Sequence, residues 1–183
     1  MRRAMRRHAV GAALSLLLLA FLGTPVRAEG GTMPEYAVKS ALLFKLPQFV
    51  YRPDVVPNAA LGMCLLGSNP FGLALDKLAQ APSDGRPVKL IRLAAGVDAA
   101  ECDFIFISRS EASTLDATLR RLGKHAVVTV SDIEGFAKAG GMVELAVGNE
   151  GAAISILINR KAAQRQNIEF NAQLLRLAKV VEP

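Results

Sequence analysis

The chain of 183 residues contains no tryptophan, two tyrosines and two cysteines. Carbohydrate-binding proteins stack sugars on exposed aromatic rings. This chain has too few tryptophan and tyrosine residues for such a surface, so a carbohydrate-binding protein is disfavoured. Only one histidine, His125, follows residue 28, and no CxxC pair occurs, so the ligand spacing of a zinc site is missing. There is no GxGxxG segment, which excludes the usual dinucleotide fingerprint. We therefore expect no metal and no cofactor.

Positive charge is concentrated at one end of the chain. The formal net charge is +6 at pH 7, and five of the 22 basic residues lie within residues 1–28, where no acidic residue occurs. The rest of the chain has 17 basic and 16 acidic residues, so it is nearly neutral. A nucleic-acid partner, which a basic protein would otherwise suggest, loses its main support.

Residues 1–28 have the three parts of a secretory signal peptide. Cationic residues 1–8 precede an uncharged apolar run of 15 residues (9–23), shorter than the roughly 20 needed to span a bilayer. Val26 and Ala28 then stand before Glu29 as small residues of a cleavage site, which predicts cleavage after Ala28 and a periplasmic protein. The alternative is that the segment is not cleaved and is retained as a membrane anchor. The paired arginines also fit twin-arginine export, although the general route is favoured.

Export places Cys64 and Cys102 in an oxidising compartment, where two cysteines have a single intramolecular pairing. Their bridge would close a loop of about 38 residues and stabilise the fold by roughly 3–4 kcal/mol. A catalytic thiol is the alternative, which the compartment disfavours.

Apolar patterning predicts one three-layer α/β domain over residues 29–183. Strands that alternate with helices pair in parallel, with helices on both faces of the sheet, and a hairpin late in the chain adds antiparallel strands. We expect a mixed, mostly parallel sheet of five to six strands. Pro47 should end the first helix early, Ser68 or Asn69 should cap the second ahead of Pro70, and Ser110 should cap the third. The expected helices are 35–50, 71–80, 111–122 and 159–180, and the expected strands are 61–66, 88–93, 103–108, 125–130, 142–147 and 152–158.

No segment has the pattern of a catalytic or phosphate-binding motif. The turn GSNPFG (67–72) follows a strand as a phosphate loop does, but Leu73 and Ala74 replace the lysine and hydroxyl residue that would hold the phosphates. It is interpreted as a strand-to-helix turn, with a weak anion site as the alternative. A catalytic triad could be assembled from Ser108, His125 and Asp132. It is disfavoured because Ser108 does not lie in the GxSxG elbow of a serine hydrolase. We expect no enzymatic activity.

Two apolar segments are candidate partner surfaces. The glycine-rich loop 135–142 carries Phe136 and Met142, and residues 171–181 place Leu174, Leu177 and Val181 at helical spacing. Turn geometry and core packing are the structural alternatives for these two segments. A further hypothesis is a small-ligand pocket formed by the 67–72 turn and the 135–142 loop at the carboxyl ends of the strands.

Several segments, in order, resemble the YfiR family of periplasmic proteins. They are EYAVKSALLFKLPQFV, MCLLGSNPFGLALDKL, CDFIFISRSE, VVTVSDIEGFAKAGGMVEL and ILINRKAAQRQNIEFNAQLLRLAKVV. The resemblance implies a compact, non-enzymatic α/β domain that tends to form homodimers. It also implies that the protein binds and represses the periplasmic region of an inner-membrane diguanylate cyclase, lowering cyclic-di-GMP signalling and biofilm formation. In the family an outer-membrane lipoprotein relieves this repression. The alternative is an accessory or ligand-binding module for another membrane sensor.

The chain departs from the family pattern in two places. Cys64 and Cys102 match a cysteine pair that forms a disulfide in the family, but a second pair found in its best-known member is absent here. The Trp-Pro ending of the family's first helix is replaced by Tyr51, Arg52 and Pro53. If that helix contacts the partner, the choice of partner differs.

Overall fold

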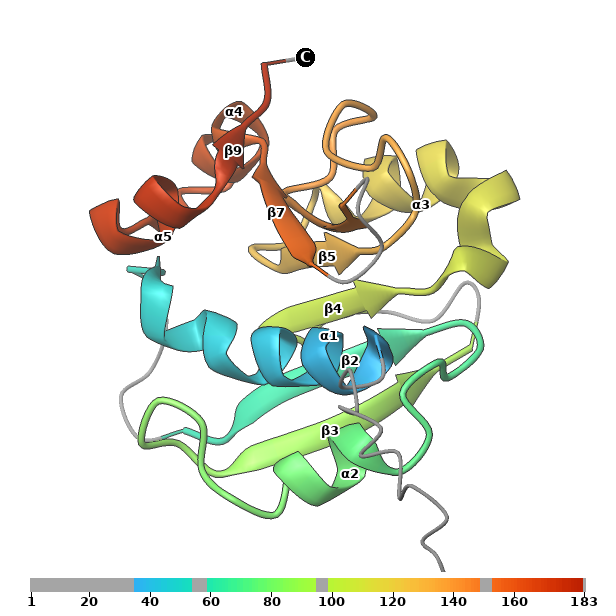
Figure 1. Ribbon diagram of the computed structural model, residues 1–183, viewed down its shortest axis with the longest axis vertical. Coiled ribbons are helices and arrows are strands. Elements are labelled where there is room, and N and C mark those ends of the chain that lie inside the picture. The colour runs from blue at the N-terminus through green and yellow to red at the C-terminus, as the bar shows by residue number, and fades with distance from the viewer. Residues whose placement is uncertain (1–34, 54–58, 95–98, 149–152, 183) are drawn as a thin grey trace, which may run out of the picture. The chain divides into compact units, whose positions relative to one another are not determined.

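The computed structural model describes residues 35–53, 59–94, 99–148 and 153–182 (Figure 1). The predicted signal peptide, residues 1–28, lies outside these ranges. The elements in the first half are α1 (Glu35–Lys45), η1 (Leu46–Phe49), β1 (Val50–Tyr51), β2 (Leu61–Leu66), α2 (Ala74–Leu78) and β3 (Val88–Leu93). The later elements are β4 (Phe104–Ile107), η2 (Arg109–Thr114), α3 (Leu115–Leu122), β5 (Val128–Ser131), β6 (Val143–Val147), β7 (Ile154–Ile158), α4 (Arg160–Gln164), β8 (Glu169–Phe170), α5 (Ala172–Leu177) and β9 (Lys179–Val180).

The main sheet has seven strands in the order β3-β2-β4-β5-β6-β7-β9. All neighbours are parallel except β6 and β7, which form the expected antiparallel pair. The predicted α/β class and mixed, mostly parallel sheet are confirmed. The sheet has one strand more than the five to six expected, and the additional strand is β9. The sequence pattern predicted helix there, but Ala178 is extended (φ −100°, ψ 156°), so α5 ends and the chain pairs with β7.

Both faces of the central strands are apolar, as a sheet covered on both sides requires. Because side chains alternate along a strand, each strand supplies both cores. Met63 of β2 and Phe106 of β4 belong to one buried cluster, while Leu66 and Ile107 from the same strands belong to the other. The helices therefore pack on two opposite apolar surfaces.

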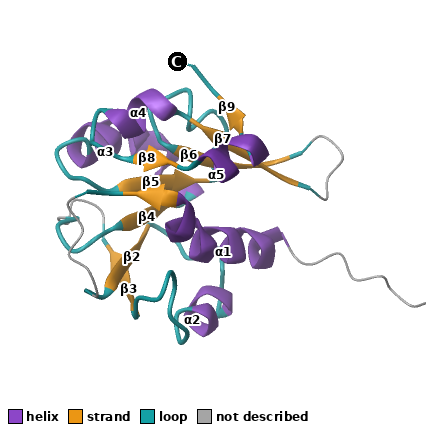
Figure 2. Ribbon diagram, turned by 90° about the vertical axis from the view of Figure 1, so that its left-hand side faces the viewer, coloured by secondary structure: helices purple, strands orange, loops and turns teal. Residues whose placement is uncertain are grey.

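The helices cover the two faces unequally (Figure 2). Figure 2 shows α1 and α2 on one side of the sheet and α3 on the other. Residues of α4 and α5 contribute to the same core as α1, whereas the 132–141 loop adds Phe136 to the α3 side. Among the described residues, no helix is long and apolar enough to cross a membrane.

Local chemistry accounts for several element boundaries. Pro47 lies in η1, the 3-10 turn that ends the first helix, as predicted. The second helix begins at Ala74, later than expected, because Asn69 instead stabilises the preceding turn by accepting from Phe71 N and donating to Gly72 O. Ser110 does not cap the third helix, since a 3-10 segment intervenes and Ser108 is its N-cap.

The chain's first and last described parts meet in a small second sheet. Val50 of β1 pairs with Phe170 of β8 in antiparallel register. Asn171 then donates its backbone N–H to Phe49 O at 2.9 Å, and its side chain caps α5 by accepting from Leu174 N. This pairing fixes α5 and β9 beside the end of α1.

Candidate functional site

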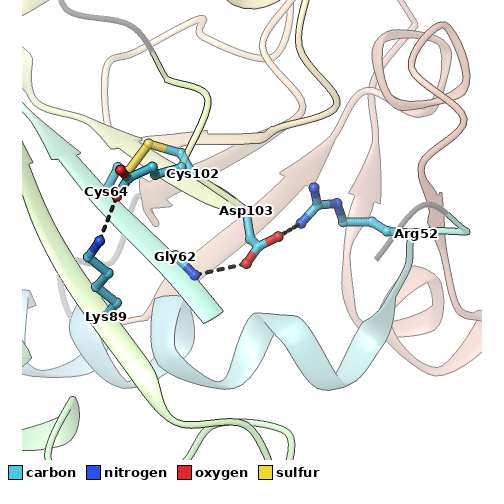
Figure 3. Close-up of a disulfide and its surroundings, with 7 residues drawn as sticks. Arg52, Gly62, Cys64, Lys89, Cys102 and Asp103 are labelled. Carbon is cyan, nitrogen blue, oxygen red and sulfur yellow. Dashed lines mark hydrogen bonds and ion pairs between the residues drawn. A yellow bond between two sulfur atoms is a disulfide. The ribbon is translucent and has the colours of Figure 1, made fainter. Parts of the chain in front are cut away.

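Cys64 and Cys102 form the predicted disulfide, with a Cα–Cα distance of 5.7 Å (Figure 3). Both residues are buried on the α3 side of the sheet. Beside them Asp103 accepts from Gly62 N at 2.8 Å and pairs with Arg52 and Arg86. The bridge and these polar contacts connect β2 to β4, which assigns the cysteines a structural role.

The most unusual charged group in the described residues is Lys39 of α1, whose side chain is fully buried. Its Nζ lies 2.8 Å from Oδ2 of Asp132, whose side chain is also fully buried. Lys39 also pairs with Glu35 one helical turn earlier, and its ammonium lies 4.8 Å from the centre of the Tyr36 ring. Removing two charges from water is unfavourable unless each is paired and hydrogen-bonded. Both charges are paired here through Oδ2 of Asp132, while its Oδ1 is buried and has no hydrogen-bond partner among the described residues.

Several donor groups surround one carboxylate oxygen of Asp132. Its Oδ2 accepts from the Tyr36 hydroxyl at 2.9 Å and from Lys39, and Arg109 Nε lies 3.2 Å away. Arg109 Nε also donates to the backbone oxygen of Asp132 at 3.1 Å. The cluster thus connects α1, the start of η2 and the residue that follows β5. We call Glu35, Tyr36, Lys39, Arg109 and Asp132 the ionic cluster.

Tyr36 is held neutral by this environment. Burial, the hydrogen bond to Asp132 and the negative charge of that carboxylate raise the pKa of the Tyr36 hydroxyl above its ordinary 10.0. Its ring packs edge-on against Phe71 at 5.9 Å, and Phe71 packs against Phe106 at 4.7 Å. The ionic cluster is therefore joined to the core through an aromatic series.

A pocket of about 410 Å³ lies next to the ionic cluster. It contains Arg109 and Asp132, which follow the carboxyl ends of β4 and β5, and Lys138 from the loop after β5. The predicted pocket combined the 135–142 loop with the 67–72 turn. The loop contributes as expected, but no residue of the 67–72 turn lines this pocket, because Ser68 N donates to Ser110 Oγ and closes that turn against η2.

The candidate partner residues are mostly buried. Phe136, Met142, Leu174 and Val181 pack in the interior, whereas the side chain of Leu177 is 72% exposed. Leu174 lies within α5 and faces the core, whereas Leu177 is the last residue of that helix, where the chain passes into β9. Of these five candidates, only Leu177 is exposed in this conformation.

The hypothetical catalytic triad of Ser108, His125 and Asp132 is not assembled, because its three residues lie in separate environments. Ser108 is buried and donates its backbone N–H to Leu66 O. Asp132 is bound by the donors of the ionic cluster, and His125 precedes β5, so it lies at the opposite end of that strand from Asp132. This arrangement gives no support to a nucleophile, base and orienting acid acting together.

Sequence reasoning missed the ionic cluster. The sequence predicted a helix from residue 35 but no charged group in its interior, whereas the buried face of α1 is formed by Lys39, Ser40, Leu43 and Phe44. The available signal was a lysine four residues before Leu43, on the core-facing side of the helix. Its partner, Asp132, directly follows a buried strand.

The fold and the buried ionic cluster define a mostly parallel α/β domain whose first helix is bonded to the carboxyl ends of the strands. The chain belongs to the YfiR/HmsC-like family, whose sequence profile matches residues 36–179. The family expected from the sequence is thereby confirmed. No curated protein matches the chain.

Two solved structures share the fold at low sequence identity. One is a conserved domain protein from Vibrio cholerae O1 biovar El Tor, with 13% identity, a TM-score of 0.56 and coverage of 81% of this chain and 60% of that one. The other is an ABC domain in complex with L-Trp from Streptococcus pneumoniae, with 13% identity, a TM-score of 0.54 and coverage of 80% and 60%. This chain thus spans about 60% of the length of either structure.

Proposed function

We propose that this protein is a periplasmic regulator that binds the periplasmic region of an inner-membrane diguanylate cyclase and represses it, lowering cyclic-di-GMP. The observation that carries this proposal is the family match over residues 36–179, since this family acts by binding rather than by catalysis. The residues of the described site agree with a binding role. Their strongest polar group, the ionic cluster, is used to hold the fold together.

The proposed docking surface is the C-terminal apolar surface, which we define as Leu177 and Val180. Their side chains are 72% and 44% exposed, and both residues lie where α5 passes into β9. β9 is also an end strand of the seven-stranded sheet, so its outer edge has free backbone groups for pairing. A cyclase segment or a second copy of this chain can use both features. An outer-membrane lipoprotein would relieve repression by competing for the regulator.

Repression of this kind works through the populations of the cyclase. A regulator that binds the inactive conformation more tightly shifts the cyclase toward that conformation. Moving the ratio from mostly active to mostly inactive requires about 5.5 kcal/mol of differential affinity. One or two buried apolar anchors, at roughly 2 kcal/mol or more each, supply a large share of that difference.

The test is a substitution at the apolar surface with a matched control elsewhere. Leu177→Glu places a charge in the proposed contact, whereas Leu73→Glu changes a side chain of equal exposure (71%) that precedes α2. Each variant replaces the wild-type gene in the native strain, and cyclic-di-GMP is measured. We expect Leu177→Glu to raise cyclic-di-GMP toward the level of a deletion strain and Leu73→Glu to leave it at the wild-type level. Equal behaviour of the two folded variants would remove this surface from the proposal.

A further inference from the structure

Cationic side chains are concentrated in the last part of the described chain, residues 153–182. Five basic residues lie there against two acidic ones, Glu169 and Glu182, so this segment has a formal charge of +3. The basic residues, all exposed, are Arg160, Lys161, Arg165, Arg176 and Lys179. Lys161 pairs with Glu182 at 3.9 Å, and the other four form no ion pair within the described ranges. Even with Glu169 opposing one of them, three cations are left for a partner of negative charge.

Two of these cations alternate with the residues of the C-terminal apolar surface. Arg176 directly precedes Leu177 at the end of α5, and Lys179 directly precedes Val180 in β9. Figure 1 shows α4 beside β9 and α5, so the cations of that helix lie in the same region. The surface therefore combines exposed apolar side chains with an excess of positive charge.

The outer edge of β9 presents backbone groups to a partner. Lys179 and Val180 lie opposite Leu157 and Ile158 of β7, and Val181 N donates to Ile158 O at 2.8 Å. Because alternate residues of a strand form bonds on opposite sides, Val180 directs its N–H and C=O away from β7. An extended polypeptide segment can pair with these groups as an added strand, which a lipid surface cannot do.

The side chains of β9 specify the pattern that an added strand needs. Val180 shares a face of the sheet with Ile158, which belongs to the same core as α4 and α5, and Lys179 points to the opposite face. Directly opposed residues of paired strands share a face, so one side chain of an added strand falls beside Lys179 and the next falls beside Val180. A segment that alternates acidic and apolar residues complements both.

A second copy of this chain fits the edge of β9 less well than an acidic segment does. Pairing two copies through β9 would bring two segments of the same positive charge together. Like charges across an interface oppose association, whereas opposite charges favour it. The charge of residues 153–182 therefore selects an acidic partner.

We infer that the C-terminal apolar surface docks an extended segment of alternating acidic and apolar residues, added as a strand to β9. Its backbone pairs with Val180, its carboxylates contact Lys179 and Arg176, and its apolar side chains cover Leu177 and Val180. This assignment rests on the proposed function, because the segment belongs to the periplasmic region of the membrane partner.

The test uses two blocked hexapeptides that differ only in charge, one of alternating glutamate and valine and one of alternating glutamine and valine. Each is titrated at low ionic strength into isotopically labelled protein expressed from the full chain, and backbone amide signals are followed by NMR. We expect the glutamate peptide to shift the signals of residues 177–181 and to bind about tenfold more tightly than the glutamine peptide. Equal affinity, or shifts confined to other residues, would overturn the proposal. So would binding to phosphatidylglycerol vesicles without binding of the glutamate peptide.

Charge reversal locates the acidic contacts. Arg176→Glu combined with Lys179→Glu should weaken binding of the glutamate peptide at least about tenfold. The control is Arg121→Glu combined with Lys124→Glu, an exposed arginine and lysine at the same spacing near the end of α3, which should leave the affinity unchanged. Both double variants change the net charge equally, and all four positions are exposed, so neither threatens folding. Equal affinity of the two variants would refute the assignment.

Cyclic-di-GMP in the native strain separates failure of this assignment from failure of the proposed function. We expect the variant reversed at Arg176 and Lys179 to leave cyclic-di-GMP near the level of a deletion strain, and the control variant to restore the wild-type level. If deletion raises cyclic-di-GMP but both variants restore it, the acidic segment is refuted while repression stands. An unchanged level on deletion would contradict the proposed function, and with it the assignment of the segment to a cyclase.

Discussion

Replacing Lys39 with methionine tests the role of the ionic cluster in stability. Methionine fills most of the same volume but leaves Asp132 buried without its nearest cation, which lies 2.8 Å away in the wild type. Breaking a buried ion pair by removing one partner costs about 3–5 kcal/mol. Arg109 remains 3.2 Å from the same oxygen, so we expect a loss near the lower limit, about 3 kcal/mol. Such a loss is a large part of the ~5–15 kcal/mol that stabilises a typical domain.

Urea unfolding measures this loss directly, with Lys45→Met as the matched control. Lys45 is the last residue of the same helix and is exposed, so its replacement should change the free energy of unfolding by about 0.5 kcal/mol or less. Adding Asp132→Asn to Lys39→Met removes the uncompensated charge and should restore part of the lost stability. A loss below about 1 kcal/mol for Lys39→Met, or no recovery in the double variant, would refute this account of the ionic cluster.

Three other predictions concern separate parts of the fold. Replacing Cys64 and Cys102 together with serine should lower the free energy of unfolding in urea by roughly 3–4 kcal/mol, and a loss below about 1 kcal/mol would contradict the bridge's role. Gly62→Ala should lower stability by about 1–3 kcal/mol in thermal unfolding, because its Cβ would overlap the Glu101 carbonyl oxygen, and an unchanged melting temperature would exclude that overlap. In a Tyr51→Phe background Tyr36 is the sole tyrosine, and its absorbance should titrate with a pKa above 10.0; a pKa at or below 10.0 would disprove its bond to Asp132. Because folding raises that pKa, the stability from neutral Tyr36 is present below pH 10.0 and is lost as the pH rises through the folded-state value.

The strands could be predicted where turn residues on each side limit a run with a strand pattern. The continuous apolar run 61–66 coincides with β2, which is buried along its whole length, and the alternating run 88–93 coincides with β3. The Cys64–Cys102 pairing followed from having only two cysteines. The end of the chain could not be predicted in the same way, since apolar residues at helical spacing also occur where α5 gives way to β9. The pairing of β9 with β7 depends on a tertiary contact that local sequence does not specify.

The polar site was beyond sequence reasoning for a different reason. Lys39 and Asp132 are 93 positions apart, and nothing local to either residue indicates that the other will neutralise it. The candidate partner residues were chosen for apolarity, a property that core and docking surface share. Leu174 and Leu177 share the same helical spacing and differ only in burial, which depends on where α5 ends against the core.

The central claim is that this protein acts from the periplasm as a brake on a cyclase. The most direct measurement is cellular cyclic-di-GMP in a deletion strain that carries either the full chain or a chain lacking residues 2–28. The account predicts that deletion raises cyclic-di-GMP and that only the full chain, with the predicted signal peptide, returns it to the wild-type level. An unchanged level on deletion, or equal rescue by the chain that lacks residues 2–28, would contradict it.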